Sequence, residues 1–220
     1  MTDVWQVAWF TVICAAGATA LMLPPGIVIA WALARRQFRG RALVETFVSL
    51  PLVMPPVATG LVLLMLLSRR GTLGGVLERA GIDIVFTSKA VVLAMSIMGL
   101  PLLVRTARAG FEQVNVRYER VAATLGAPPL RVFLTISLPL AWPSVLAGAV
   151  LAFARGLGEF GATIVVAGSI PGQTQTIAVA IYSLVETGQD ALAARLVLLS
   201  AAIAFAALWC ANWLVERRAA

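Results

Sequence analysis

Long apolar runs separated by polar segments dominate the hydrophobic pattern of this chain. They cover about 7–34, 44–68, 86–106, 137–167 and 195–215. Each is near or above the roughly 20 apolar residues that a helix needs to cross the hydrocarbon core of a bilayer. We therefore predict an all-α fold, a single domain over 1–220 that forms a polytopic membrane helix bundle of about five transmembrane helices. A shorter apolar piece, about 176–185, predicts either a re-entrant or a surface helix.

The most informative polar segment lies between the third and fourth runs, at about 112–136. Within it, Glu119 to Gly126 reads Glu-Arg-Val-Ala-Ala-Thr-Leu-Gly, and Ile-Ser-Leu-Pro follows from Ile136 after nine residues. This pattern predicts a short helix that ends at a glycine and is polar enough to leave the bilayer. Such a helix can dock on a partner encoded elsewhere. The alternative is a plain helix-loop-helix joint at the membrane surface.

Composition and charge support a membrane protein and give it an orientation. The chain is 60% hydrophobic and 12% charged with a mean hydropathy of +0.94, which excludes an ordinary soluble domain. The net charge of +7 comes largely from arginines that follow the first and third runs, which is typical of cytoplasmic loops and not of a nucleic-acid surface. We predict an outside amino terminus, a cytoplasmic carboxyl terminus and a cytoplasmic location for the polar segment at 112–136.

Few residues suit catalysis or metal binding. There is no histidine, and Cys14 and Cys210 lack CxxC spacing, so we predict no metal site and expect both cysteines to be buried small hydrophobes. No phosphate-binding Gly-x-x-x-x-Gly-Lys-Ser/Thr motif occurs, so this chain cannot hold nucleotide phosphates by that route. An intramembrane enzyme would need a His, Asp or Ser constellation within the spans. A structural membrane anchor would leave the segment at 112–136 unexplained.

That segment resembles the cytoplasmic loop of ABC importer permeases. The family signature is Glu-Ala-Ala, three residues, Gly, nine residues, Ile, one residue and Leu-Pro. Arg120 and Val121 stand where the family has glutamate and alanine, and Glu119 is displaced by one position. The resemblance implies the ABC transporter type-1 transmembrane fold, no cofactor on this chain, and a separate ABC ATPase subunit that uses ATP. The residues it implies for coupling to the ATPase are Glu119, Ala122, Ala123, Gly126, Ile136, Leu138 and Pro139.

Two other segments, at 50–57 and 152–176, are similar to molybdate permeases. Sulfate permeases share only the Gly-Glu-aromatic-Gly core of the second segment. The resemblance implies a transport subunit for molybdate, with sulfate, thiosulfate or tungstate as alternative cargo. It also implies a homodimer in the prokaryotic plasma (inner) membrane, in contact with lipid and not nucleic acid. An extracytoplasmic molybdate-binding protein would deliver the anion.

Several residues are candidates for the pathway or its gate. Prolines inside a span free backbone carbonyls, which favours broken helices in proteins that change shape, although a static kink is the alternative. Arg155 and Glu159 stand four residues apart, hence on one helical face and close enough to pair. They are either gate or pathway residues or a structural pair near the helix end. The segment from Gln173 to Thr176 offers hydroxyls and amides without positive charge, which suits a dianion that must be released again. The alternative interpretation of this segment is a solvated turn built on Pro171 and Gly172. The candidates are Pro55, Pro56, Arg155, Glu159, Thr163, Thr174 and Thr176.

Overall fold

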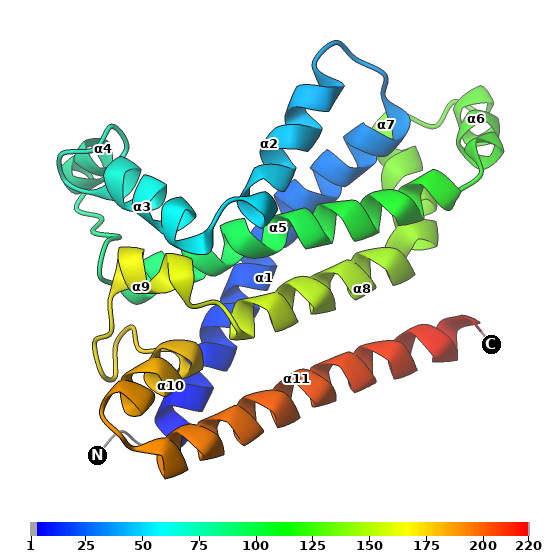
Figure 1. Ribbon diagram of the computed structural model, residues 1–220. Coiled ribbons are helices and arrows are strands. Elements are labelled where there is room, and N and C mark those ends of the chain that lie inside the picture. The colour runs from blue at the N-terminus through cyan, green and yellow to red at the C-terminus, as the bar shows by residue number, and fades with distance from the viewer. Residues whose placement is uncertain (1–3, 220) are drawn as a thin grey trace.

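The computed structural model describes residues 4–219, except the side chains of 211, 212 and 214–219. Every regular element in this part of the chain is helical (Figure 1), which confirms the predicted all-α class. In chain order the elements are α1 (Val4–Arg35), α2 (Arg41–Val53), α3 (Pro56–Leu67), α4 (Gly74–Arg79), α5 (Ser88–Gln113), α6 (Val116–Thr124), α7 (Pro129–Val132), the π-helical turn η1 (Phe133–Ser137), α8 (Leu138–Leu157), α9 (Gly161–Ala167), α10 (Ile177–Glu186) and α11 (Asp190–Ala219).

Four helical stretches between residues 4 and 219 are long and apolar enough to cross a membrane. They are α1, α5, the continuous stretch Pro129–Leu157 and the Asp190–Cys210 part of α11. The bent pair of α2 and α3 provides a fifth if both helices belong to one span. The short apolar segment near 176–185 is α10, which packs against α11 and contacts α1.

The second apolar run is two helices and not the single helix predicted over 44–68. The chain bends by 113° between α2 and α3. Met54 and Pro55 each precede a proline, which disfavours helical geometry, and their ψ angles are 146° and 132°. Pro56 then occupies the first turn of α3, where the missing N–H costs nothing. Pro55 and Pro56 thus set the direction of α3.

The fourth apolar run also differs from the single helix predicted over 137–167. Its helix begins earlier, at Pro129, passes through η1 and ends at Leu157. α9 then starts anew at Gly161, because the side chain of Glu159 accepts a hydrogen bond of 2.8 Å from the N–H of Ala162. A carboxylate that caps a first turn favours a new helix start over continuation.

α5 lies at the centre of the bundle and packs along both α1 and α8. Small residues allow the close approach: a Cβ at Gly99 would lie 3.0 Å from Cε of Met22 on α1, and one at Gly148 would lie 3.1 Å from the carbonyl oxygen of Leu103. Leu103 and Phe111 of α5 are completely buried. This seam gives the molecule a rigid centre from which the other elements extend.

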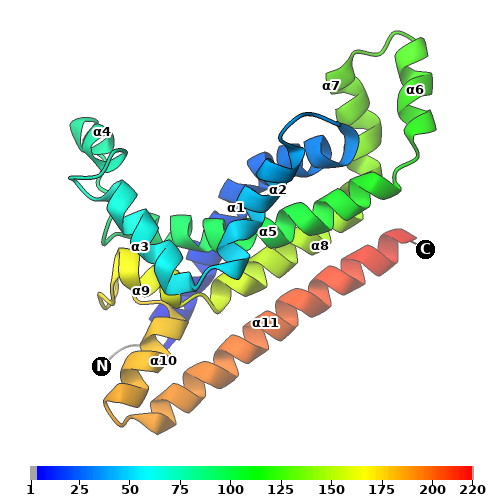
Figure 2. The ribbon, with the colours of Figure 1, turned by 45° about the horizontal axis from the view of Figure 1, so that its top comes forward.

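The elements separate into two ends of the molecule (Figures 1 and 2). α6, α7 and the carboxyl terminus lie at one end, whereas the amino terminus, α4, α9 and α10 lie at the other. α11 runs alongside α8 with much of its surface exposed. The prediction that both cysteines are buried is wrong for Cys210, which is exposed on α11, while Cys14 is buried in α1. A helix whose outer face meets lipid has no need to bury its apolar residues against protein.

Candidate coupling and pathway site

α6 is a short, well-capped helix that projects from the bundle. The side chain of Asn115 accepts a hydrogen bond of 2.9 Å from the N–H of Arg117 at its start. At its end Gly126 adopts φ 83°, and the N–H groups of Gly126 and Ala127 donate to the carbonyls of Ala123 and Ala122. This is the Schellman arrangement, which favours glycine because its φ is positive. The glycine in the predicted motif therefore ends the helix as expected.

An apolar groove of about 610 Å³ separates α6 from η1 and the start of α8. Tyr118, Val121 and Leu125 recur at spacings of three and four residues, so they lie on one face of α6. Leu125 is 82% exposed, and Val121 and Tyr118 are also exposed. The residues lining the groove are Tyr118, Val121, Ala122, Leu125, Thr135, Ile136, Pro139 and Leu140. So much exposed apolar surface on a helix outside the spans is characteristic of a protein interface.

The predicted coupling residues divide into four groups in the structure. Ala122, Ile136 and Pro139 line the groove. Ala123 and Gly126 are exposed at the end of α6, and Leu138 packs partly buried against the core that contains Phe111 and Val145. Glu119 does not line the groove. The 3.6-residue periodicity of α6 alone identifies Tyr118, Val121 and Leu125 as neighbours on one face. The family signature does not specify Tyr118 or Leu125, and it has alanine at the position of Val121.

Glu119 joins three elements of its own chain. Its Oε1 accepts hydrogen bonds from Nε of Arg35 at 3.0 Å and from Oγ of Ser137 at 2.8 Å. Arg35 also donates through Nη2 to the carbonyl of Val114 at 2.7 Å. The side chains of Arg35 and Glu119 are only 11% and 19% exposed. These bonds connect α6 to the end of α1 and to η1, so movement of α6 reaches the bundle directly.

A second candidate region is the seam where α3 packs on α9. The two backbones touch: a Cβ at Gly60 would lie 2.8 Å from Cα of Ala162, and one at Gly161 would lie 2.7 Å from Cβ of Pro56. Thr59 on α3 and Thr163 on α9 are buried, and neither hydroxyl oxygen has a hydrogen-bond partner among the described residues. Buried hydroxyls normally find a partner. Thr59 and Thr163 are therefore buried polar groups on two touching helices.

Arg155 and Glu159 form an ion pair beside this seam. Nη1 of Arg155 lies 2.7 Å from Oε2 of Glu159, in a geometry that is not aligned as a hydrogen bond. Glu159 is 1% exposed and Arg155 27% exposed. The other carboxylate oxygen of Glu159 caps α9 through Ala162. One side chain therefore both neutralises the arginine and starts the helix that contacts α3.

Thr174 and Thr176 lie in the loop before α10. Thr174 Oγ1 accepts from the N–H of Ile170 at 3.0 Å, and Thr176 Oγ1 accepts from the N–H of Val179 at 3.5 Å. Both threonines are buried. The loop is held to α1 by a bond of 2.9 Å from the N–H of Ile177 to Oγ1 of Thr11. These contacts give the two hydroxyls local structural partners.

Comparison with known proteins identifies the family. Residues 26–219 match the family described as binding-protein-dependent transport system inner membrane component. The chain is 45% identical over 214 residues to the molybdenum transport system permease protein ModB of Escherichia coli (strain K12), which covers 96% of this chain and 93% of the relative. It belongs to this permease family.

Two further comparisons bear on that assignment. The permease is 37% identical to the sulfate transport system permease protein CysT of Salmonella typhimurium, over 71% of this chain and 57% of the relative. Its fold matches a bacterial ABC transporter involved in the import of the acidic polysaccharide alginate, with a TM-score of 0.75, 18% sequence identity and coverage of 96% and 78%. The type-1 importer fold predicted from the sequence is confirmed, and the chain is a multi-pass transport subunit and not an enzyme.

Glu159→Gln is expected to lower transport by the permease severalfold without preventing its assembly. Glutamine keeps an oxygen that accepts from Ala162 and so preserves the cap of α9. It removes the charge that balances Arg155. Uptake should be measured per amount of membrane-inserted protein, with Glu159→Ala as the variant that removes both functions. Unaltered uptake in the glutamine variant would assign the ion pair a purely structural role.

Proposed function

We propose that this permease forms the membrane pathway of an ATP-driven importer for molybdate. The observation that carries the proposal is the 45% identity to a molybdenum transport permease over 96% of the chain. Likeness to a sulfate permease is lower, at 37%, and extends over less of the chain, which favours molybdate over sulfate. Tungstate has the same charge and shape as molybdate and stays an alternative cargo.

The partner that supplies energy is a separate ABC ATPase subunit. The apolar groove between α6 and η1 is an interface of the size and polarity that a partner protein would cover. Leu125 is the most exposed apolar side chain in it, which makes it the natural anchor. The permease itself binds no nucleotide in this scheme; closure of the ATPase subunits moves α6, and Glu119 transmits the motion to α1 and η1 through Arg35 and Ser137.

A second copy of the permease completes the pathway. α2 and α3 extend from the bundle and leave large apolar side chains exposed, including Phe47, Val53 and Met65. A twofold homodimer places two such arms around one path, and a closed C2 arrangement with two ATPases needs no further subunit. The seam of α3 and α9 would then border the path, with Arg155, Glu159 and Thr163 from the sequence candidates and Thr59 in addition.

The separation of the two ends supports a proposed orientation in the plasma (inner) membrane (Figures 1 and 2). α6 and the carboxyl terminus share one end, and the ATPase is cytoplasmic, so this end faces the cytoplasm and the amino terminus lies outside. The arginines after α1 and α5 agree with this direction. An extracytoplasmic molybdate-binding protein would deliver the anion to the opposite end, near α4, α9 and α10.

Labelled molybdate uptake tests the cargo. The chromosomal permease gene is deleted in cells that contain the ATPase and the binding protein, and the permease is supplied from a plasmid. Uptake is then measured with and without excess tungstate or sulfate. We expect uptake to depend on the permease and to fall at least tenfold with tungstate at about ten times its Kd, but not with sulfate. Inhibition by sulfate would move the cargo to sulfate. Uptake independent of this chain would contradict the importer function.

A further inference from the structure

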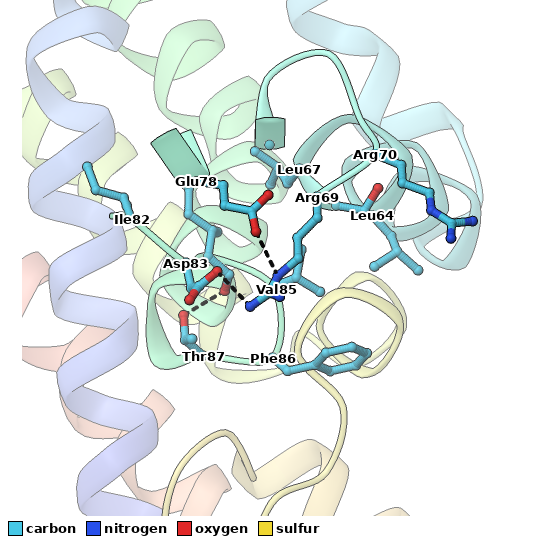
Figure 3. A pocket seen from close by; sticks show the side chains of 13 residues that line it. Leu64, Leu67, Arg69, Arg70, Glu78, Ile82, Asp83, Val85, Phe86 and Thr87 are labelled. Atoms are coloured by element: carbon cyan, nitrogen blue, oxygen red, sulfur yellow. Dashed lines mark hydrogen bonds and ion pairs between the residues drawn. The ribbon is translucent and has the colours of Figure 1, made fainter. Parts of the chain in front are cut away.

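A pocket of about 640 Å³ lies at the end of the molecule opposite to α6. It is enclosed by the last turn of α3, the short helix α4 and the loop that leads to α5 (Figure 3). The volume is within the range of sites that bind small molecules. None of the coupling residues and none of the residues of the α3–α9 seam lines it.

Tight backbone packing holds the walls of this pocket in place. A Cβ at Gly71 or Gly74 would overlap backbone carbonyl oxygens at the end of α3, so α4 folds back onto α3 without space between them. The N–H of Leu73 donates to the carbonyl of Leu66 at 3.1 Å. Phe86 has a positive φ of 59°, which costs energy for a residue other than glycine, and its N–H donates to Val166 of α9 at 3.1 Å. The pocket is therefore a built feature and not a loose loop.

Its charged groups balance each other and are loosely paired. Nε of Arg69 lies 3.5 Å from Oε1 of Glu78, and Nη2 of Arg69 lies 3.6 Å from Oδ1 of Asp83 (Figure 3). All three side chains are largely exposed. Arg70 also lines the pocket and forms no ion pair with any described residue. Exposed pairs at these distances contribute little, so a ligand can replace them.

The pocket has an apolar wall beside its charged groups. Leu64 and Leu67 belong to the end of the apolar helix α3, and the polar segment starts directly after them with Ser68 and Arg69. Val85 and Phe86 continue the apolar wall on the far side. Arginines and aromatic rings at the end of an apolar span lie at the level of lipid headgroups. The pocket therefore has apolar side chains followed directly by charged ones, the order that an acyl chain and its headgroup require.

We propose that this pocket binds the headgroup of a zwitterionic phospholipid that carries a primary amine, such as phosphatidylethanolamine. The guanidinium group of Arg69 binds the phosphate, since arginine matches phosphate oxygens in a bidentate manner. Arg70 points away from the cluster of Arg69, Glu78 and Asp83 and adds positive charge nearby (Figure 3). Glu78 and Asp83 accept hydrogen bonds from the ammonium group, and Leu64 and Phe86 contact the start of the acyl chains. Two positive and two negative groups give no net attraction for a free dianion, which argues against the transported anion as the occupant.

Native mass spectrometry of the full-length permease tests this site. The protein is equilibrated with phosphatidylethanolamine, phosphatidylcholine and phosphatidylglycerol of identical acyl chains. We expect phosphatidylethanolamine to be retained preferentially, and Arg69→Ala with Arg70→Ala to weaken its retention about tenfold. Arg79→Ala is the matched control, because Arg79 is the last residue of α4, near Arg69 and Arg70 in the chain, but does not line the pocket. Equal retention of all three lipids, or equal loss in the control, would contradict the proposal.

A second variant separates headgroup binding from a folding defect. Glu78→Gln with Asp83→Asn keeps the shape of the pocket but removes its negative charge. We expect its preference to shift from phosphatidylethanolamine to phosphatidylglycerol, a change that unfolding does not produce. An unchanged preference would overturn the assignment of the ammonium group. Displacement of the lipid by inorganic phosphate or molybdate would identify a simple anion site. Displacement by the binding protein would identify a docking surface. Either result would overturn the lipid proposal.

Discussion

Leu125→Arg is expected to reduce ATP-driven uptake at least about tenfold while leaving the permease inserted in the membrane. Leu125 is 82% exposed on α6 and lines the apolar groove, so it supports no core of its own chain. A buried apolar anchor at the centre of an interface commonly contributes 2 kcal/mol or more to binding. An arginine there would have to be desolvated without a partner. Co-purification of the ATPase with the permease measures the loss directly.

Leu73→Arg provides the control for the same chemical change. Leu73 is also exposed, but it precedes α4 at the opposite end of the molecule (Figure 1). We expect this variant to retain the ATPase. A Leu125→Arg protein that still binds its ATPase with unchanged affinity would show that the groove is not the docking surface.

Removal of the Glu119 carboxylate is expected to impair coupling and stability together. In Glu119→Gln the buried Arg35 loses its counter-charge, which we expect to cost about 2 kcal/mol of unfolding free energy because the pair is mostly, not fully, buried. Uptake should fall severalfold while the ATPase stays bound, since Glu119 does not line the groove. ATP hydrolysis measured with and without the binding protein should lose part of its stimulation.

A double-mutant cycle isolates the pair. Arg35→Gln, Glu119→Gln and the double variant should give a coupling energy of about 1–3 kcal/mol from unfolding measurements. Arg36→Gln is the matched control, because Arg36 lies over the ring of Trp31 at 5.1 Å and pairs with no described carboxylate. If Glu119→Gln instead releases the ATPase as fully as Leu125→Arg does, Glu119 belongs to the docking surface, as the family signature suggested.

Long-range pairing explains why the role of Glu119 was not evident from sequence. Glu119 and Arg35 are separated by 84 positions, and Glu119 and Ser137 by 18. The displaced position of Glu119 shows a departure from the family signature, but it names no partner for the carboxylate. α5 and the turn before α6 bring the three side chains together, and no local pattern encodes that meeting. The same holds for Thr59, whose unsatisfied hydroxyl becomes informative only once α3 is seen against α9.

The breaks in the spans were only partly predictable. Pro55-Pro56 predicts a disturbed helix, because each proline restricts the residue before it. The angle of 113° and the contact of α3 with α9 depend on the packing of Pro56 against Gly161. Glu159 shows the reverse case: its spacing from Arg155 predicted the ion pair correctly, but the same side chain also caps α9. A glutamate cap of this kind is hard to recognise from the sequence, because glutamate is equally favourable in the middle of a helix.

The sequence by itself determined the all-helical membrane class, the approximate position of the apolar runs and the polar helix that ends at Gly126. Each depends on local properties: hydropathy over about 20 residues, helical periodicity and the need for positive φ after a helix. Only the tertiary structure decided the direction of α3, the groove beside α6 and the partners of Glu119. These depend on contacts between distant segments, and the free energy of such contacts is set by the packing of the whole bundle and not by the residues next in the chain.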